Sequence, residues 1–558
     1  MTDASGALGI IAETDVPVRM RDGVILRANV FRPDASRKFP AILVRTPYAK
    51  NTCGLERYVR AGYAVVSQDS RGRYASEGEF IPFSAENTGD AEDGFDTVEW
   101  LAGQPWCNGK VGTMGCSYNA WMQWMLAKLR PPHLVAMCAS SIPLELTGVD
   151  WPGAFKAGRR VRFWFTTLGP EIRRRQGLPG PHTVEEAAKI WDDVEQGRWL
   201  GFLPWLDLPR HLPRGLAEYA EDWLRHPARK VWRFAEAHRE VEVPNLDFSG
   251  WYDHCGGTMG HLAGMQKNGR TELARTQTKL VLGPWSHSGL GRRKIGEIDF
   301  GPQAEVDLDD LTIRWFDRWL KGLDNGVDRE PAVRYFVMGS GRWKSARTWP
   351  PEGGKESAFH LAASGTLSPE VPREDSAAAY SYDPADPVPS LCTKKIFTVP
   401  SDRRALDHRQ DILRYRTPPL AEDVEIVGYP RVVLYASSSA PDTDFFARLV
   451  DEHPDGPALD VCYGMVRARH RHSLDCEEFL TPGEIAEFDI RLGATACRFL
   501  KGHRIRLEIT SSDFPVHDRN HNTGLNDLAD ARLAVAHQKV FQSARRRSRL
   551  IVNLAEES

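Results

Sequence analysis

The chain has 558 residues, of which 41% are hydrophobic and 26% are charged, and its formal net charge at pH 7 is −3. This length exceeds what one hydrophobic core holds, so we expect about two to four domains of a globular protein. The near-neutral charge excludes a global field that attracts nucleic acid or an anionic membrane. No apolar run approaches the roughly 18 residues of a membrane-spanning helix. The N-terminus has no basic segment followed by a long apolar run, which predicts that no signal peptide is present.

The nine cysteines are scattered along the chain, and none stands in a C-x-x-C pair. An odd number at irregular spacing is typical of reduced thiols and argues against a disulfide framework or a zinc site. We therefore predict a cytoplasmic protein.

Residues 1–144 alternate strand patterns with helix patterns. Asp22-Gly23 is a strong turn dipeptide and predicts a hairpin. The apolar runs PAILVR, YAVVSQD and GKVGTMG are typical of buried strands, whereas TGDAEDGFDTVEWLA and AWMQWMLAKL have helical patterns. Strands that alternate with helices indicate a parallel sheet covered on both faces.

Residues 145–240 are rich in Trp, Arg and Pro, and their periodic segments are helical, as in TVEEAAKIWDDVEQG, GLAEYAEDWLRH and KVWRFAEAH. We expect a helical insertion here. The strand pattern resumes over 241–330 with PNLDFSGWYD and TKLVLGPWSHS, followed by the helix pattern DLTIRWFDRWLKG.

Residues 331–558 contain short, often alternating runs separated by turn residues, among them AVRYFVMG, VVLYASSS and HRIRLEITSS. This pattern predicts an antiparallel β-sandwich. The predicted fold class is α/β: a core formed by 1–144 and 241–330, a helical insertion over 145–240, and a β-sandwich over 331–558.

The stretch GTMGCSYNAW places Ser117 between a predicted strand and a predicted helix. Such a position is typical of a nucleophile elbow, where the serine hydroxyl stands clear of the sheet. Gly115 occupies the small-residue place before the serine, but Asn119 stands where the strict G-x-S-x-G pattern has glycine. A serine that caps a helix is the alternative explanation of this stretch.

Two further residues complete a hydrolase pattern. A serine nucleophile needs a base within hydrogen-bond reach and a carboxylate that orients the base. In α/β-hydrolases the chain order is Ser, then Asp or Glu, then His, each just past a strand. Asp253 follows LDFSGWY and His287 follows KLVLGPWS, so Ser117, Asp253 and His287 have the correct order.

With these residues the chain resembles the cocaine esterase / X-Pro dipeptidyl-peptidase (peptidase S15-like) family of α/β-hydrolases, and most closely its bacterial cocaine esterase branch. The resemblance rests on RTPYAK, GYAVVSQDSRGRYASEGEF, GCSYNAWMQW, GWYD, GPWSHS, YDPADPVPS, SSAPDTDF and GHRIRLEITSSDFP, which extend from residue 45 to 515. It implies an α/β-hydrolase core, an inserted helical cap and a C-terminal jelly-roll-like β domain.

The resemblance also implies roles for individual residues. The family's nucleophile, acid and base match Ser117, Asp253 and His287, and its oxyanion-hole tyrosine matches Tyr48. The backbone N–H of Tyr118 is the second oxyanion donor. No metal or organic cofactor is implied. The chain departs from the family at Ala120, where glycine is usual.

The leading hypothesis is a serine hydrolase that cleaves a small-molecule ester or amide through an acyl-enzyme. The rival is an X-Pro aminopeptidase or α-amino-acid ester hydrolase, which must hold a free ammonium with carboxylates. Glu145 and Asp150 are the acids that we place near the pocket. A third hypothesis is that the chain is a catalytically inactive binding protein and not an enzyme. No nucleic acid or membrane partner is predicted, and a homo-oligomer is left open.

Several other polar residues receive structural interpretations. Asp69 and Arg71 are expected to form an ion pair behind the elbow. His254 is expected to have a structural role, with a position in the pocket as the alternative. The basic cluster of the insertion comprises Arg159, Arg160, Arg162, Arg173, Arg174 and Arg175. We expect it to be a solvated helix face, with contact to an anionic substrate as the alternative.

Overall fold

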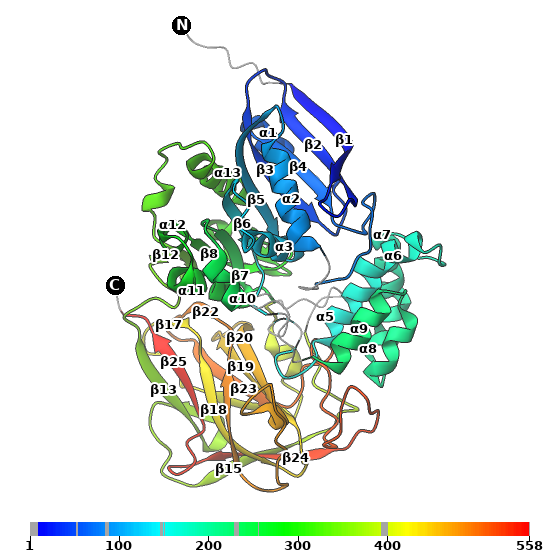
Figure 1. Cartoon of the computed structure of the whole chain (residues 1–558). Coiled ribbons are helices and arrows are strands. Elements are labelled where there is room, and N and C mark those ends of the chain that lie inside the picture. Colours follow the sequence, from blue (N-terminus) through cyan, green and yellow to red (C-terminus); the bar gives the residue numbers. More distant parts are fainter. Residues whose placement is uncertain are drawn as a thin grey trace.

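The computed structural model describes residues 9–51, 54–83, 89–145, 149, 151–227, 234–254, 256–391 and 400–556 (Figure 1). Across those ranges, none of the helices combines the length and the apolar character that crossing a membrane requires.

A six-stranded sheet with the order β1-β2-β4-β3-β5-β6 lies at the N-terminal end of the molecule. Its strands are β1 (Ile10–Arg19), β2 (Ile25–Pro33), β3 (Phe39–Thr46), β4 (Ala64–Asp69), β5 (Cys107–Cys116) and β6 (Leu134–Ser140). β1 and β2 form the predicted hairpin, and Gly23 in its turn has a φ of 91°, which glycine adopts without strain. The strands from β3 to β6 pair in parallel.

A four-stranded sheet with the order β12-β11-β8-β7 continues this layer. Its strands are β7 (Leu246–Tyr252), β8 (Lys279–Ser286), β11 (Val333–Val337) and β12 (Arg342–Ala346). A parallel bridge between Met137 and Asn245 joins β6 to the start of β7. The Asn245 side chain also binds the backbone N–H and C=O of Ala139, at 2.8 and 3.1 Å. The two sheets therefore form one parallel layer, flanked by the antiparallel strands β1, β2 and β12.

The segment AVRYFVMG lies elsewhere than the sequence predicted. It was expected in the C-terminal β-sandwich, but β11 pairs in parallel with β8 and so extends the first layer. The alternating pattern correctly predicted a strand. It does not encode the partner strand, which depends on contacts remote in sequence.

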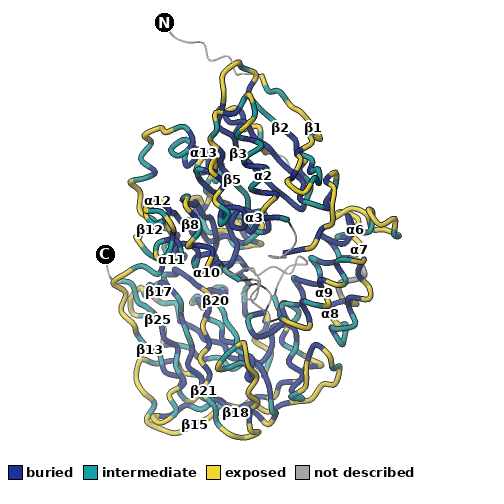
Figure 2. The backbone as a smooth tube through the Cα atoms, in the orientation of Figure 1, coloured by how far each residue is buried: buried dark blue, intermediate teal, exposed yellow. Residues whose placement is uncertain are grey.

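Helices cover both faces of the parallel layer, as predicted. They are α1 (Glu56–Arg60), α2 (Asp90–Ala102), α3 (Tyr118–Ala127), α11 (Met259–Asn268), α12 (Glu272–Gln277) and α13 (Leu308–Trp319). Ile42 on β3 packs in a cluster with Trp315 and Phe316 of α13, whereas Leu43 packs in the cluster that contains α2 and α3. Successive strand residues point to opposite faces, so these clusters are the two sides of the sheet. The strands β3, β4, β7 and β8 of this layer are buried along their whole length (Figure 2).

Short helices form the insertion between β6 and β7. They are α5 (Ala157–Arg162), η1 (Phe163–Leu168), α6 (Gly169–Arg175), α7 (Val184–Ile190), η2 (Trp191–Glu195), α8 (Gln196–Leu200), η3 (Trp205–His211), α9 (Leu216–Arg225) and α10 (Phe234–Ala237). The segments η1 and η2 are π-helices. Trp164, Trp191 and Trp205 are buried in the core of this part. The first residues of the predicted helix KVWRFAEAH lie outside the described residues.

The C-terminal part is β-rich, and its pairs are antiparallel apart from β14 with β16. Its strands are β13 (Lys355–Ala362), β14 (Thr366–Ser368), β15 (Ser376–Tyr382), β16 (Leu413–Arg416), β17 (Val424–Gly428), β18 (Arg431–Ser438), β19 (Asp444–Glu452), β20 (Ala458–Arg467), β21 (Ala486–Arg491), β22 (Thr495–Phe499), β23 (Arg504–Thr510), β24 (Ala536–Gln542) and β25 (Arg549–Leu554). Two short strands, β9 (Lys294–Ile295) and β10 (Ile298–Asp299), form a separate pair.

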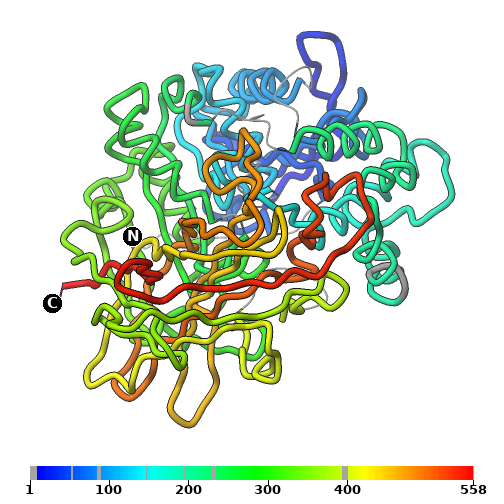
Figure 3. Tube along the Cα trace, turned by 90° about the horizontal axis from the view of Figure 1, so that it is seen from below, coloured from blue at the N-terminus to red at the C-terminus, as the bar shows by residue number. Residues whose placement is uncertain are grey.

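The segment from residue 515 to 528 joins the β-rich part to the helical insertion (Figure 3). Gly158 donates its backbone N–H to Pro515, Asp518 donates to Phe155, and Leu206 donates to Leu528. The first two bonds hold the chain on both sides of the start of α5, and the third holds η3.

Candidate active site

Ser117 lies in a sharp turn between β5 and α3, with φ 62° and ψ −121°. Positive φ is strained for a residue with a side chain and is common at functional sites. The Ser117 N–H donates to the Ser140 carbonyl at 2.9 Å, and its own carbonyl accepts from Trp121 at 3.0 Å. This backbone geometry is typical of a nucleophile elbow, and it favours that interpretation over a simple helix cap. The Ser117 side chain makes no capping hydrogen bond.

The glycine before the elbow is required by space as well as by backbone angle. Gly115 has a φ of 147°, and a Cβ at this position would lie 2.6 Å from the Cβ of Asn119. The strict motif has glycine at both places. In this chain the absence of a side chain at Gly115 makes room for Asn119.

Asp253 and His287 follow the carboxyl ends of the neighbouring parallel strands β7 and β8. The Nδ1 atom of His287 lies 2.9 Å from Oδ1 of Asp253, whose side chain is fully buried. A buried carboxylate on Nδ1 fixes the ring so that Nε2 is left for another partner.

Tyr48 comes after the end of β3, and its backbone N–H donates to Oγ1 of Thr46 at 3.1 Å. Burial raises the pKa of the Tyr48 phenol, although the positive charges of Arg159 and Arg160 oppose this. The hydroxyl is therefore protonated at neutral pH and can donate a hydrogen bond. Tyr118 is the first residue of α3, where backbone N–H groups have no acceptor within the helix.

A cavity of about 250 Å³ brings these elements together. It is lined by Tyr48, Ser117, Arg159, Arg162, Phe163, Thr167, His254 and His287. Asp253 lies behind His287. No hydrogen bond joins Ser117 to His287 in the described part of the chain, and such bonds often tighten only when substrate is bound.

His254 lines the cavity, which was the alternative to a purely structural role. Its ring centroid is 4.2 Å from that of His287. Burial lowers the pKa of His254 well below its ordinary value, and the charges of Arg159 and His287 lower it further. His254 is therefore neutral beside His287.

The arginines of the predicted basic cluster lie in different environments. Arg159 and Arg162 line the cavity, but Arg160 is buried, with its guanidinium 5.4 Å from the Phe163 ring centre. Arg174 pairs with Glu171 at 2.7 Å. The expectation of one solvated face is wrong.

The remaining arginines of that cluster bind backbone carbonyls. Arg173 donates to His211 and Arg175 donates to Tyr74, at 3.1 and 3.0 Å. Of the acids that the sequence placed near the pocket, Glu145 is absent from the described cavity lining, and Asp150 lies outside the described residues.

Phe163 and Thr167 were not predicted. Together with Arg159 and Arg162 they follow the spacing i, i+3, i+4, i+8, which places residues on one face of a helix. That spacing was visible in the sequence, but nothing in it showed which face meets the nucleophile.

Two groups of described side chains bring three potential metal ligands together: Asp253, His254 and His287, and Asp451, His453 and His503. The first coincides with the candidate catalytic pair. In the second, the carboxylate oxygens of Asp451 lie 2.8 Å from Nδ1 of His503 and 3.4 Å from Nε2 of His453, distances that ordinary polar contacts account for.

Comparisons with known proteins agree with this arrangement. The family model of the X-Pro dipeptidyl-peptidase (S15 family) matches residues 22–289, and that of the X-Pro dipeptidyl-peptidase C-terminal non-catalytic domain matches residues 325–551. The chain is 36% identical over 546 residues to the cocaine esterase of Rhodococcus sp. (strain MB1 Bresler), with 92% of each protein covered. The chain belongs to the cocaine esterase / X-Pro dipeptidyl-peptidase family.

Solved structures of similar fold cover nearly the whole chain. An α-amino acid ester hydrolase has a TM-score of 0.77 and 25% identity, with 100% of this chain and 98% of that chain covered. An aminopeptidase from a Thaumarchaeota archaeon has a TM-score of 0.79 and 24% identity, with 99% and 98% covered. The predicted family and the α/β-hydrolase fold with a β-rich C-terminal part are confirmed. The chain is a serine hydrolase of the ester-cleaving class.

Proposed function

We propose that this enzyme cleaves a carboxylic ester of a small organic molecule through an acyl-enzyme on Ser117. The observation that carries the proposal is the single cavity into which Ser117, His287 and Tyr48 open, with Asp253 held 2.9 Å behind the imidazole. Each of these residues follows the carboxyl end of a parallel strand, where α/β-hydrolases gather their catalytic groups.

Acylation begins with attack of Ser117 Oγ on the ester carbonyl carbon. Nε2 of His287 takes the serine proton as the C–O bond forms, and Asp253 stabilises the resulting imidazolium. Negative charge develops on the former carbonyl oxygen. The Tyr48 hydroxyl and the Tyr118 N–H donate to it.

The tetrahedral intermediate then collapses and the alcohol leaves, taking the proton from His287. Deacylation repeats the sequence with water: His287 removes a proton from water as the water attacks the acyl carbon. Ser117 leaves as the new carboxylic acid forms, and recovers its proton from the imidazolium.

The proposal includes a division of the chain into a hydrolase core (1–144 and 241–330), a helical cap (145–240) and a jelly-roll-like β domain (331–558). One change to these bounds is favoured: β11 pairs with β8 and β12 pairs with β11, so residues up to Ala346 belong with the core. We also propose a cytoplasmic location, since no disulfide joins the described cysteines.

Covalent labelling tests the nucleophile. A fluorophosphonate probe is expected to label the wild-type enzyme at Ser117, and Ser117→Ala is expected to abolish labelling and to lower ester turnover by several orders of magnitude. Cys116→Ala is the matched control, one residue away and on the same turn, and is expected to retain both. Retained activity in Ser117→Ala with loss in Cys116→Ala would refute the assignment.

A further inference from the structure

Two arginines line the candidate catalytic cavity together with Ser117. Arg159 and Arg162 lie three residues apart on α5, and Phe163 and Thr167 continue the same face into the π-helix η1. Single π-helical turns often occur at functional sites. The described residues that line this cavity include both arginines and two histidines but no carboxylate.

Arg162 is partly buried and forms no ion pair with the described part of the chain. Its Nε atom is buried without a hydrogen-bond partner. Burial lowers the pKa of the Arg162 guanidinium, and the carboxylate of Asp192 on η2 opposes this at longer range. A partly buried cation without an ion-pair partner is costly, so a site of this kind is suited to an anion that arrives from solution.

The neighbouring groups experience the same positive field. Arg159 acts on the pKa of both the Tyr48 phenol and the His254 imidazole, in each case in the direction expected from a nearby positive charge. Arg162 is not among the largest effects on either pKa. Arg159 is therefore the cation that we assign to the oxyanion region, and Arg162 is the one that we assign to another part of a substrate.

We propose that the cavity selects esters that carry a second, negatively charged group, such as a carboxylate, and that Arg162 binds this group with Arg159 as a second cation. The inference rests on the proposed hydrolysis at Ser117 and names its substrate class. A guanidinium fits a carboxylate with two parallel hydrogen bonds, and such charge-assisted bonds are stronger in a partly buried site than in water.

The same field disfavours the rival substrate class. An α-amino ester or an X-Pro peptide presents an ammonium group, which needs carboxylates close to the nucleophile. The described lining offers cations instead. A substrate with a free ammonium is therefore expected to be a poor one.

Matched substrates test the proposal. One arm compares mono-p-nitrophenyl adipate with p-nitrophenyl hexanoate, which lacks the carboxylate, and with the ammonium ester p-nitrophenyl 6-aminohexanoate. The other arm compares 4-butyryloxybenzoate with 4-butyryloxybenzamide, so that the charge lies on the leaving group. In at least one arm the anionic ester is expected to have a kcat/KM about tenfold or more above that of its neutral partner. Added salt is expected to reduce this preference.

Variants assign the preference to Arg162. In Arg162→Gln the ratio of anionic to neutral kcat/KM is expected to fall by about tenfold or more, whereas Arg162→Lys keeps the charge and part of the ratio. Arg225→Gln is the control, because Arg225 is an exposed arginine of the same insertion that pairs with Glu221. Arg225→Gln is expected to leave kcat/KM unchanged for the anionic ester and for the neutral ester.

The outcomes separate this inference from the proposed function. Hydrolysis of the neutral esters without an anionic preference in either arm, or a preference that survives Arg162→Gln, would overturn the inference alone. Absence of both ester turnover and fluorophosphonate labelling would overturn the proposed function, and the inference with it. Labelling of Arg162→Gln at a rate close to that of the wild type shows that the variant is folded.

Discussion

At the scale of single residues, Tyr48 offers the sharpest test of the proposed oxyanion hole, because its hydroxyl can be removed without changing the backbone. Tyr48→Phe keeps the ring that packs edge-on against Tyr118 and Phe163. Loss of one oxyanion donor typically costs about 100- to 1,000-fold in kcat. We expect a loss of this size, with little change in KM if acylation limits the rate.

A matched control for this variant is Tyr58→Phe, which removes a phenol on α1 that donates to Asp309, outside the described cavity lining. Tyr58→Phe is expected to lower the free energy of unfolding and to leave kcat nearly unchanged. If Tyr48→Phe instead kept kcat within a few-fold of the wild-type value, Tyr48 would be a packed aromatic and not an oxyanion donor.

Sequence order predicted which residues meet at the site, since Ser117, Asp253 and His287 each follow a strand of one parallel layer. It failed for the pair Asp69 and Arg71. Asp69 pairs with Lys50 at 2.9 Å, and Arg71 reaches Asp93 on α2 at 2.6 Å. Proximity in sequence does not fix the direction of side chains at a strand end. Partners on other elements decide it.

At the scale of elements, the elbow between β5 and α3 depends on Gly115. Gly115→Ala forces a Cβ within 2.6 Å of Asn119 at a φ of 147°. Overpacking of this kind typically costs about 1–3 kcal/mol, with further backbone strain. We expect a lower free energy of unfolding in a denaturant titration, together with a lower kcat.

Two variants show whether the elbow geometry is responsible. Gly197→Ala on α8 adds the same methyl group where nothing lies within 4 Å and is expected to leave stability unchanged or slightly higher. Asn119→Gly in the Gly115→Ala background removes the clashing atom and is expected to recover part of the loss. Equal stability of Gly115→Ala and wild type would contradict the assigned role.

The sequence predicted the helices and strands more reliably than it predicted which of them pack or pair with each other. The hairpin at Gly23 and the helices α2, α3 and α13 follow from local patterns of turn residues and apolar spacing. The pairing of β11 with β8 does not, because residues 333–335 and 280–282 meet only after α13 has returned the chain to the sheet. Likewise, the helical pattern around Arg159 and Arg162 did not show which face meets Ser117.

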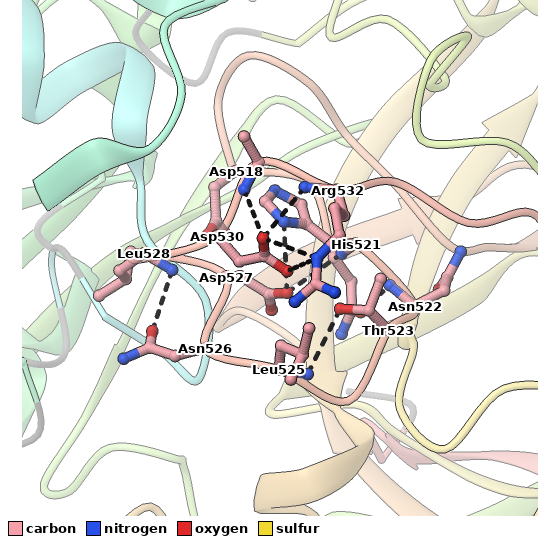
Figure 4. A network of polar contacts seen from close by, with 12 residues as sticks. Asp518, His521, Asn522, Thr523, Leu525, Asn526, Asp527, Leu528, Asp530 and Arg532 are labelled. Carbon is pink, nitrogen blue, oxygen red and sulfur yellow. Dashed lines mark hydrogen bonds and ion pairs between the residues drawn. The ribbon is translucent and has the colours of Figure 1, made fainter. Parts of the chain in front are cut away.

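At the scale of the whole molecule, buried charges hold the β-rich part against the helical insertion. Arg467 on β20 contacts Asp444, Asp518 and Asp527 at 2.8 to 3.1 Å, and all four side chains are almost fully buried. Figure 4 shows the loop that carries Asp518 and Asp527. The Asp518 N–H donates to Phe155, four residues before Arg159, so the network supports the helix that lines the cavity.

Removing the central cation tests this support. Arg467→Met leaves the buried carboxyl groups of Asp444, Asp518 and Asp527 without their shared partner and is expected to lower the free energy of unfolding by about 3–5 kcal/mol. Arg532→Met is the control in the same loop, since Arg532 is largely exposed and pairs with Asp530 at 3.1 Å. It is expected to cost about 1 kcal/mol or less. Similar losses in the two variants would show that burial of the network adds nothing.

The same network predicts a pH dependence of stability. Burial raises the pKa of Asp518 from 3.8 to about 7, against the attraction of Arg467. The folded state therefore keeps this proton at pH values where the unfolded state has lost it. The contribution of Asp518 to stability is fully present below about pH 4 and is lost as pH rises through about 7. We expect Asp518→Asn to gain stability relative to the wild type as pH rises over this interval, by at most about 1.4 kcal/mol per pH unit.

Asp530 in the same loop gives the control of opposite sign. Its hydrogen bond with Arg532 lowers the pKa of the Asp530 carboxyl, so its stabilising contribution is present above the ordinary pKa of 3.8 and is lost as pH falls below it. Chemical denaturation of the wild type, Asp518→Asn and Asp530→Asn from pH 4 to 8 measures the free energy of unfolding and separates the contributions of Asp518 and Asp530. Between pH 4 and 7 the difference between Asp518→Asn and wild type is expected to change steadily, while that for Asp530→Asn stays nearly constant. A difference for Asp518→Asn that does not vary with pH would mean that Asp518 is ionised in the folded protein, with Arg467 compensating fully for its burial.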